Sequence, residues 1–458
     1  MVQFPFYLGK HLIGVCSNAS IVYRCSLVKC LYPILCRFSG YGSKVILSRF
    51  KALHFRVESS GRDAKKWYLW GVKVRGYIVS LLLILVPVLV RGQEISVSAA
   101  QNFLTSAPPI ARLVQEPRTF QAFDASISWE TSQTEAARLL GSPRLGLGVS
   151  YANLGSCRCI PGSRLGDTFS IYGSIKHPIL RLGPFMAGYN IELGTAFMSH
   201  PYHIYDNPGN LLYGGPITIH VKGGFFALVQ VSPRLGLEAD IDFRHNSSCR
   251  LIIPNAGVNA VSCSLGARYR IGNGTLKPGE HRPQDDPLDR KFRFSIFAGG
   301  GIHRCMAEFN ADKLLPPEER QSSYTPWFKG SIGADFVWHY SRVTSSGLQA
   351  ELHYLSNTEA LVRSDNALYG PAERSYSPFA PGLAVIQDLY FGSFTAGVGV
   401  GAYLYKKVGV HEDHGRLYQK VWLKYYPPSL HGLFAGICLR AHKFNQADYL
   451  EFSIGKIL

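Results

Sequence analysis

The amino-acid sequence predicts an all-β fold, an antiparallel transmembrane β-barrel of the outer-membrane type with about 14 strands. Three observations predict it. From about Pro143 onward, segments of about 8–15 residues alternate apolar residues with small or polar residues, and turn-forming residues separate them. This part of the chain has no run of about 20 apolar residues, the length that a membrane-spanning helix needs. The connections between segments also alternate between short and long, as periplasmic turns and external loops do in such barrels.

The clearest of these segments is Leu235–Phe243, in which every second residue is apolar and Glu238, Asp240 and Asp242 fall between apolar neighbours. A row of acids beside a row of apolar side chains is typical of a strand with lipid on one side and a polar lumen on the other. A soluble β-sandwich or barrel with one wet face is the alternative interpretation. The expected strands are, approximately, 144–153, 167–178, 184–198, 216–230, 234–246, 258–271, 292–303, 327–340, 347–356, 382–391, 393–406, 416–426, 431–442 and 448–457.

The expected connections divide into two classes that alternate along the chain. The stretch 272–291 is an exception, because it is long yet falls where a short periplasmic turn is due. With both ends of the chain in the periplasm, the number of strands must be even, and the segments give 14, with 12 or 16 as alternatives. The short connections are 181–183, 231–233, 341–346, 392 and 427–430.

The charge of the chain is unevenly distributed. The 458 residues carry a formal charge of +17, but residues 1–92 alone contain 14 Lys and Arg against 2 Asp and Glu. The rest of the chain is therefore close to +5, and the total charge does not indicate nucleic-acid binding. The 25 Tyr, 26 Phe and 46 Gly, with only 17% charged residues, are instead typical of a large β-protein with an aromatic-rich surface.

The N-terminal part is expected to be a targeting segment rather than part of the fold. A basic region precedes Tyr77–Val90, an apolar run of 14 residues, and this pattern predicts a signal peptide over residues 65–92. A membrane anchor is the alternative. Residues 1–64 are expected to be a non-native or disordered extension that arises from a start codon assigned too far upstream. The mature chain then divides into an N-terminal periplasmic segment, 93–142, and the barrel, 143–458.

We expect neither a metal nor an organic cofactor. Cys157 and Cys159 are too closely spaced for a typical zinc pair, and no second pair follows them. The segment 411–414 (HEDH) lies in an expected loop, so a solvated loop is favoured over a metal site. His353 and Ser356 also pair a histidine with a serine, but they are three residues apart, a spacing that puts them on opposite faces of a strand. We therefore interpret them as polar residues at the end of a strand.

A candidate catalytic group lies at the external end of the strand 234–246. His245 and Ser247 are two residues apart, so they project from the same face of an extended strand. A turn around Pro254–Gly257 returns the chain, so Asn259 on the next strand can lie across from them. A nucleophile, a base and a group that orients the base are the minimum set for a serine hydrolase. The alternative is a polar loop with an incidental His and Ser.

Several motifs around this group occur in one order. They are PRLGLGVSYANLG at 143–155, YNIELGTAF at 189–197, DNPGN at 206–210, and HxS followed by PNxGxN at 245–259. Together they resemble the outer-membrane lipid A 3-O-deacylase (PagL) family, especially the longer relatives of Bacteroidetes type that are described as acyloxyacyl hydrolase-like. The resemblance covers about residues 140–271, and the closing part of the chain, 418–455, is similar to the C-terminal half of those longer relatives.

The resemblance implies a β-barrel enzyme that hydrolyses an ester-linked hydroxyacyl chain of lipid A in the outer leaflet. By position, it makes Ser247 the nucleophile, His245 the general base and Asn259 the group that orients the base. Some members have a carboxylate in place of Asn259, so we expect slower acylation here than in those members. The family pattern after the serine is usually an Asn followed by small residues that form the oxyanion hole. Here Ser248 and Arg250 are expected to supply the oxyanion and substrate contacts.

The prediction is therefore an outer-membrane serine esterase that deacylates lipid A through a His–Ser–Asn triad without a cofactor. The expected partners are lipid A or lipopolysaccharide and the outer membrane, with a second copy of the chain as a further candidate and no nucleic acid. The alternative is a non-catalytic structural or transport barrel, in which the residues after Ser247 mark a degenerate site. A soluble periplasmic esterase is a third interpretation.

Overall fold

The computed structural model describes residues 94–105, 108–131, 142–271, 291–443 and 446–458. These residues belong to one compact unit, Leu89–Leu458. The expected extension and signal peptide lie outside the described residues.

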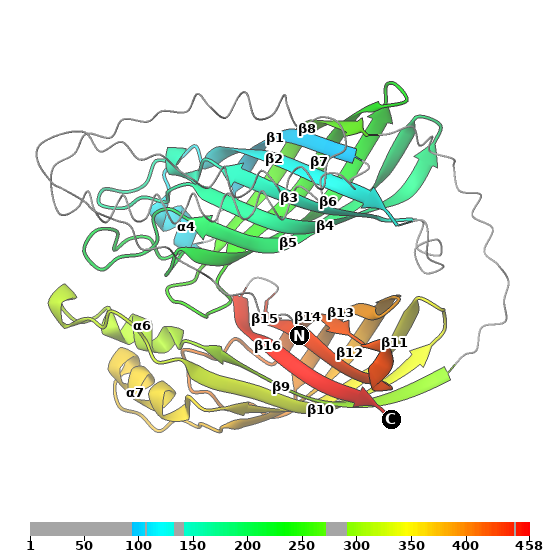
Figure 1. Ribbon diagram of the computed structural model, residues 1–458. Coiled ribbons are helices and arrows are strands. Elements are labelled where there is room, and N and C mark those ends of the chain that lie inside the picture. The colour runs from blue at the N-terminus through cyan, green and yellow to red at the C-terminus, as the bar shows by residue number, and fades with distance from the viewer. Residues whose placement is uncertain (1–93, 106–107, 132–141, 272–290, 444–445) are drawn as a thin grey trace, which may run out of the picture. The chain divides into compact units, whose positions relative to one another are not determined.

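The first eight strands form a closed antiparallel barrel (Figure 1). They are β1 (Glu94–Leu104), β2 (Thr119–Glu130), β3 (Arg144–Ala152), β4 (Thr168–Leu182), β5 (Phe185–Met198), β6 (Ile217–Gln230), β7 (Leu235–Ser247) and β8 (Val258–Arg270). Each strand pairs with the next one along the chain, and β1 pairs with β8 to close the sheet, with Glu94 opposite Arg270. We call this the N-terminal barrel.

The remaining eight strands form a second closed antiparallel barrel, the C-terminal barrel. They are β9 (Lys291–His303), β10 (Trp327–His339), β11 (Thr344–Leu355), β12 (Phe379–Phe391), β13 (Phe394–Tyr403), β14 (Leu417–Tyr425), β15 (Leu433–His442) and β16 (Gln446–Ile457). Strand β9 pairs with both β10 and β16, so this sheet also has no free edge.

The helices are short and lie in the connections between strands. None of the described helices is long and apolar enough to cross a membrane. They are α4 (Pro108–Leu113), α6 (Met306–Asp312) and α7 (Thr358–Tyr369), with 3-10 turns η2 (Leu154–Ser156), η3 (Pro317–Glu319) and η4 (Pro428–Leu430).

The all-β barrel class is confirmed. We expected one barrel of about 14 strands, whereas the described strands close into two barrels. All the expected strands are present, and the described residues form 16 strands in two barrels. The additional strands, β1 and β2, lie in 93–142, so the expectation of a periplasmic segment there is wrong, and the barrel does not begin at 143. The exceptional long stretch is also explained, because 271–290 joins β8 of one barrel to β9 of the other.

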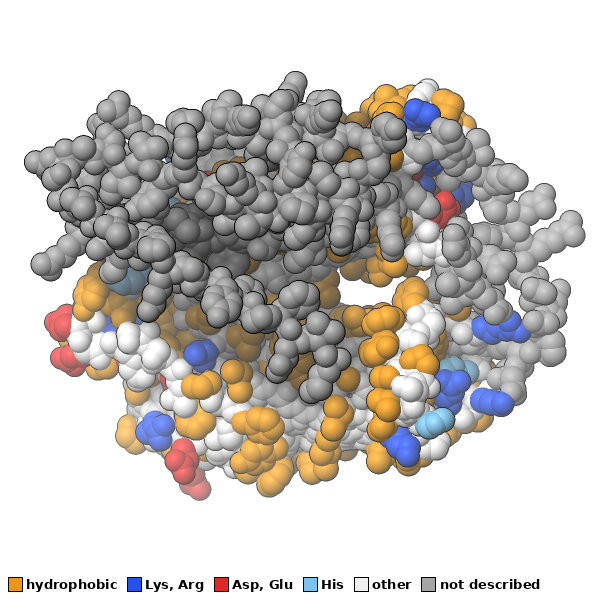
Figure 2. All heavy atoms as spheres, viewed as in Figure 1, with side chains coloured by type: hydrophobic (Ala, Val, Ile, Leu, Met, Phe, Trp, Pro, Cys, Tyr) orange, Lys and Arg blue, Asp and Glu red, His pale blue; other side chains and the backbone are white. Residues whose placement is uncertain are grey.

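Side chains that point out of the barrels differ in chemistry from those that point in. On β7, outward-facing Leu237, Ile241 and Phe243 are 53%, 63% and 48% exposed, whereas inward-facing Glu238 and Asp242 are buried. Hydrophobic side chains cover much of the described surface in Figure 2. In a closed barrel the sheet satisfies its own backbone hydrogen bonds, so an apolar exterior is compatible with the bilayer interior. The protein is therefore a β-barrel protein of the outer membrane.

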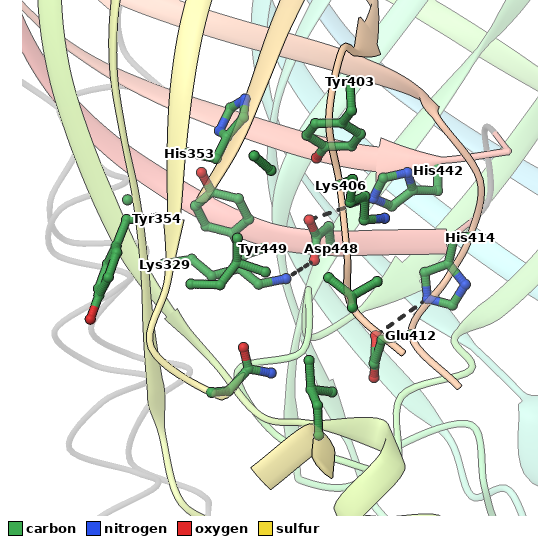
Figure 3. A pocket seen from close by; sticks show the side chains of 16 residues that line it. Lys329, His353, Tyr354, Tyr403, Lys406, Glu412, His414, His442, Asp448 and Tyr449 are labelled. Atoms are coloured by element: carbon green, nitrogen blue, oxygen red, sulfur yellow. Dashed lines mark hydrogen bonds and ion pairs between the residues drawn. The ribbon is translucent and has the colours of Figure 1, made fainter. Parts of the chain in front are cut away.

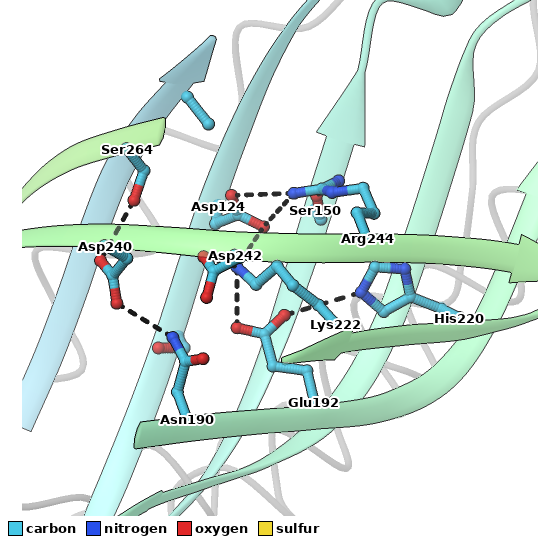
Figure 4. Close-up of polar contacts among 12 residues, drawn as sticks. Asp124, Ser150, Asn190, Glu192, His220, Lys222, Asp240, Asp242, Arg244 and Ser264 are labelled. Carbon is cyan, nitrogen blue, oxygen red and sulfur yellow. Dashed lines mark hydrogen bonds and ion pairs between the residues drawn. The ribbon is translucent and has the colours of Figure 1, made fainter. Parts of the chain in front are cut away.

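Ion pairs fill the interior of the N-terminal barrel (Figure 4). Lys222 Nζ lies 2.9 Å from Glu192 Oε1 and 3.8 Å from Asp124 Oδ1, and Arg244 Nη2 lies 3.4 Å from Asp124 Oδ2. Arg244 also donates to Ser150 Oγ at 3.0 Å. An eight-stranded barrel is just wide enough for side chains to fill it. A cavity of about 20 Å³ within this network has room for about one water, so this interior does not resemble a transport channel.

The interior of the C-terminal barrel contains a cluster of buried charges around the carboxylate of Glu351. Its Oε1 pairs with Lys420 and lies 3.2 Å from Arg440 Nη2, and its Oε2 accepts a hydrogen bond from Tyr418 at 2.9 Å. The Glu351 side chain is 0% exposed. A carboxylate without contact to water depends on such partners, because burying an unpaired charge is unfavourable. Removing one partner of a buried ion pair lowers the stability by about 3–5 kcal/mol.

Candidate active site

Three side chains form a hydrogen-bonded chain at the end of β7. His245 and Ser247 share one side of the strand, and the register between β7 and β8 places Asn259 opposite His245. Ser247 Oγ lies 2.9 Å from His245 Nε2, and His245 Nδ1 lies 2.6 Å from Asn259 Oδ1. With its proton on Nδ1, the ring donates to the amide oxygen, and Nε2 can accept the hydroxyl proton of Ser247. The structure thus brings together the three residues that the sequence spacing singled out.

This chain of residues lies on the outer, lipid-facing side of the barrel. His245 and Ser247 continue the outward row that includes Ile241 and Phe243, whereas Arg244, which lies between Phe243 and His245, points inward and is buried. They lie at the end of β7 remote from the short turn 231–234, which places them at the external end of the strand. Sequence reasoning did not state that the group faces lipid, although the alternation along β7 already contained that signal.

Loops cover the group, since Ser247 is only 3% exposed although it faces out of the barrel. Gly257 provides one close approach. Its φ is +71°, and a Cβ on it would lie 3.2 Å from His245 Cε1 and from Ser247 Cβ. A side chain there would be strained and would push the pair apart. The Gly257 N–H also donates to Leu212 O at 3.0 Å, which ties the loop 199–216 to the site.

The DNPGN motif shapes that covering loop. Asn207 and Asn210 both donate to the backbone oxygens of Arg164 and His200, at 2.9–3.2 Å. Asn210 Oδ1 accepts from the Leu212 N–H at 3.1 Å. These bonds hold the Leu212 carbonyl oxygen in position to accept the hydrogen bond from the Gly257 N–H. The motif therefore acts on the site through the conformation of the loop.

Ser248 follows the candidate nucleophile, but its polar groups hold the loop that comes next. Its N–H donates to Asn255 Oδ1 at 2.7 Å. Its Oγ lies 2.6 Å from Ile252 O and 3.0 Å from Asn255 Oδ1. A hydroxyl has one proton to donate, and here it is already used, so this geometry does not favour the expected oxyanion contact from the Ser248 side chain.

Arg250 also has resident partners. Its Nη1 forms an ion pair with Glu412 Oε2 at 2.6 Å, and its Nη2 lies 3.1 Å from His414 Nε2. Burial by itself would raise the pKa of Glu412, but Arg250 outweighs this and holds that pKa well below its ordinary value. The guanidinium is thus not a free fork for an oxyanion. Glu412 is only 8% exposed, so the expectation that 411–414 forms a solvated loop is wrong for this residue.

The backbone turns sharply after Ser247. Cys249 and Arg250 have φ of +51° and +62°, a left-handed conformation that costs a non-glycine residue about 1–2 kcal/mol. Cys249 Sγ lies 3.9 Å from Ser247 Oγ. Burial raises the pKa of this thiol to about 11, so near neutral pH it remains protonated and does not compete as a thiolate nucleophile.

The neighbouring strand β6 presents an apolar surface with a gap. Its register places Ile219 opposite Ser247 and Val221 opposite His245. Gly223 comes next on the same outward face, and a Cβ on it would meet just one atom of the described residues within 4 Å, a backbone oxygen at 3.6 Å. We call this free space the Gly223 gap. Sequence reasoning missed it, because only the register reveals which strand glycine lies beside the site.

The described residues contain no group of three or more His, Cys, Asp and Glu side chains that could hold a metal ion. The six described cysteines are free thiols.

Replacing Asn259 by leucine, which has nearly the same shape, should lower kcat for ester hydrolysis about 10–100-fold. The substitution removes the acceptor for His245 Nδ1–H, and a hydrogen bond to a group that becomes charged is worth about 1.5–3 kcal/mol. Asn259→Asp should retain activity, because aspartate also accepts this bond and stabilises the imidazolium better. Steady-state kinetics with a micellar ester substrate measures both. Full activity of Asn259→Leu would show that Asn259 does not orient His245.

Comparisons with solved structures give weak likenesses to outer-membrane proteins. The structure titled "Crystal structure of the outer membrane enzyme PagL" has 16% identity and a TM-score of 0.26, and the match covers 38% of this chain and 99% of that one. Neisserial surface protein A has 14% identity and a TM-score of 0.25, over 39% of this chain and 96% of that one. An outer membrane channel from Pseudomonas putida F1 has 10% identity and a TM-score of 0.19, and the match covers 80% of this chain and 96% of that one.

Among curated proteins, no match to this chain is found. The family model described as "Acyloxyacyl hydrolase, C-terminal domain" matches residues 292–456, which make up the C-terminal barrel. The candidate active site lies in the other barrel, outside the matched residues. The resemblance to acyloxyacyl hydrolase-like proteins that the sequence indicated is confirmed for the C-terminal barrel, by this match to residues 292–456.

Proposed function

We propose that this protein is a serine esterase of the outer membrane that hydrolyses an ester-linked hydroxyacyl chain of lipid A. The observation that carries the proposal is the hydrogen-bonded chain of Ser247, His245 and Asn259 on the outward face at the external end of β7. An ester of an outer-leaflet lipid is the substrate that this location favours. The family match of residues 292–456 supports the same class of reaction.

In the proposed mechanism, Ser247 Oγ attacks the acyl carbonyl carbon while its proton passes to His245 Nε2. The tetrahedral intermediate collapses, the C–O bond to the sugar breaks, and His245 returns the proton to the departing hydroxyl. Water, activated by the same imidazole, then attacks the acyl-serine and releases the fatty acid. Asn259 keeps the proton of the ring on Nδ1 throughout.

In the same proposal, the oxyanion binds to the backbone N–H groups of Cys249 and Arg250. Two observations support this role: the side chains of Ser248 and Arg250 have other partners, and the two left-handed residues follow the nucleophile directly. Successive N–H groups in a turn of this kind can form an anion-binding concavity. One oxyanion donor is worth about 2.7–4 kcal/mol to the transition state, which exceeds the strain of about 1–2 kcal/mol per residue.

The test is to produce the mature chain in the outer membrane of a host with hydroxyacylated lipid A. Lipid A is then extracted and weighed by mass spectrometry. We expect the wild type to remove the mass of one hydroxyacyl chain. Unchanged lipid A with the wild type would favour the non-catalytic barrel, and recovery of the activity in the soluble fraction would favour a periplasmic esterase.

The Gly223 gap is expected to accommodate the acyl chain beside Val221. Filling it with Gly223→Phe should raise KM about tenfold or more while kcat for a short-chain ester changes little, because the reacting groups are untouched. The matched control is Ala239→Phe, which adds a ring to the same outward face near the other end of β7, where Ala239 is exposed. Equal kinetics of the two variants with a long-chain ester would show that the chain does not use the gap.

A further inference from the structure

The external end of the C-terminal barrel contains a pocket that the proposed esterase mechanism does not use. It lies between strands β10, β11, β15 and β16 and the loop 404–416, next to the start of α7. Its volume is about 30 Å³, enough for a small polar group. Asn357 contributes to the lining. Figure 3 shows the charged side chains and histidines that do so as well: Lys329, His353, Lys406, Glu412, His414, His442 and Asp448.

The two carboxylates of the lining are already neutralised. Asp448 Oδ1 pairs with Lys329 Nζ, and Asp448 Oδ2 lies 3.5 Å from His442 Nε2. Glu412 pairs with Arg250 at 2.6 Å. The negative charge of the pocket therefore has its own cations, and any further cation is in excess.

Lys406 is that excess cation. Its Nζ lies over the ring of Tyr403, 5.0 Å from the centroid, and no carboxylate of the described residues lies within ion-pair distance of it. Burial lowers the pKa of Lys406, and the attraction of the more distant carboxylates of Asp448, Asp413 and Glu412 only partly offsets this effect. The pocket thus has positive charge that an anion would compensate.

Two buried polar atoms of the lining also lack a partner among the described residues, His353 Nδ1 and Asn357 Oδ1. Their residues are 4% and 1% exposed. His353 Nε2 lies 3.4 Å from Arg440 Nη1 and accepts from it, so Nδ1 carries the ring proton and is a donor. A buried polar group without a hydrogen-bond partner destabilises the protein, because it has lost its water and gained nothing in return. A ligand that accepts from His353 and donates to Asn357 would remove both costs.

We propose that this pocket binds the phosphate group of a phosphomonoester. Phosphate oxygens accept from the Lys406 ammonium and from His353 Nδ1–H, and a protonated phosphate oxygen donates to Asn357 Oδ1. A cation would be repelled by Lys406, and a neutral ligand would leave that charge uncompensated. Inorganic phosphate and the headgroup of an outer-leaflet lipid share this chemistry.

The proposal is tested by calorimetric titration of the full chain in detergent with inorganic phosphate. The experiment uses the Ser247→Ala background, so that binding is measured without hydrolysis and failure of the esterase proposal does not affect it. Lys406→Met should weaken phosphate binding at least about tenfold and abolish the rise in Tm that phosphate produces. It should not destabilise the free protein, because the ammonium has no ion-pair partner to lose.

The matched control is Lys407→Met, which removes an exposed lysine next to the pocket residue and should bind phosphate as the background does. Phosphate binding that is absent at millimolar concentration, or equal in the two lysine variants, would overturn the proposal. Vesicles then show whether the bound phosphate group belongs to a lipid headgroup or to free inorganic phosphate. Binding to phosphatidic acid but not phosphatidylcholine vesicles that depends on Lys406 identifies a lipid headgroup, whereas Lys406-dependent binding of inorganic phosphate alone identifies the free ion.

Discussion

Replacing Ser247 by alanine is expected to lower kcat for lipid A deacylation by about 10⁴-fold or more, to the level left by positioning and oxyanion binding alone. The substitution removes the atom that forms the acyl-enzyme. It should leave the barrel intact, because the side chain contributes one hydrogen bond to His245, worth about 1 kcal/mol. The measurement is the mass of lipid A extracted from membranes that contain equal amounts of folded variant.

Ser232→Ala is the matched control for this prediction. Ser232 is an exposed serine in the short turn between β6 and β7, at the opposite end of the same strand. Deacylation should be unchanged in this variant. His245→Ala should be as inactive as Ser247→Ala, and the double variant no worse than either, because the two residues act as one unit. Deacylation that persists in Ser247→Ala would place the chemistry elsewhere in the chain.

Replacing Glu351 by alanine is expected to lower the free energy of unfolding of the C-terminal barrel by about 3–5 kcal/mol. The substitution leaves the buried cations of Lys420 and Arg440 facing each other without the carboxylate between them. Urea titration in detergent micelles measures the effect as a lower midpoint. The urea midpoint of Glu351→Gln should lie between those of the wild type and Glu351→Ala, because glutamine can still accept a hydrogen bond from Tyr418 but carries no charge.

Glu359→Ala is the control for this stability prediction. Glu359 lies on α7, where its side chain is 92% exposed and pairs with Arg363 at 4.0 Å. Exposed pairs of this kind contribute about 0–1 kcal/mol, so the midpoint should barely move. If Glu351→Ala and Glu359→Ala unfold at the same urea concentration, the carboxylate at 351 does not organise the interior.

Local pattern was sufficient to predict the strands β3 to β16 and the polarity of their faces. A strand in a membrane barrel must alternate apolar and polar side chains, and this requirement is written into each segment separately, as in Leu235–Phe243. The strands β1 and β2 were missed because small residues, Ser and Ala, weaken the contrast between their two faces. Closure was missed for a different reason. Whether β8 pairs with β1 or with β9 depends on contacts between distant parts of the chain.

The candidate site divides in the same way. By itself, the sequence determined that His245 and Ser247 share a strand face and that Asn259 can lie opposite, because strand geometry has a period of two and the return turn is short. Only the tertiary structure decided that Ser248 and Arg250 are engaged by Asn255 and Glu412, and that Gly257 packs against the pair. These contacts depend on where loops lie in space, and no period along the chain encodes that.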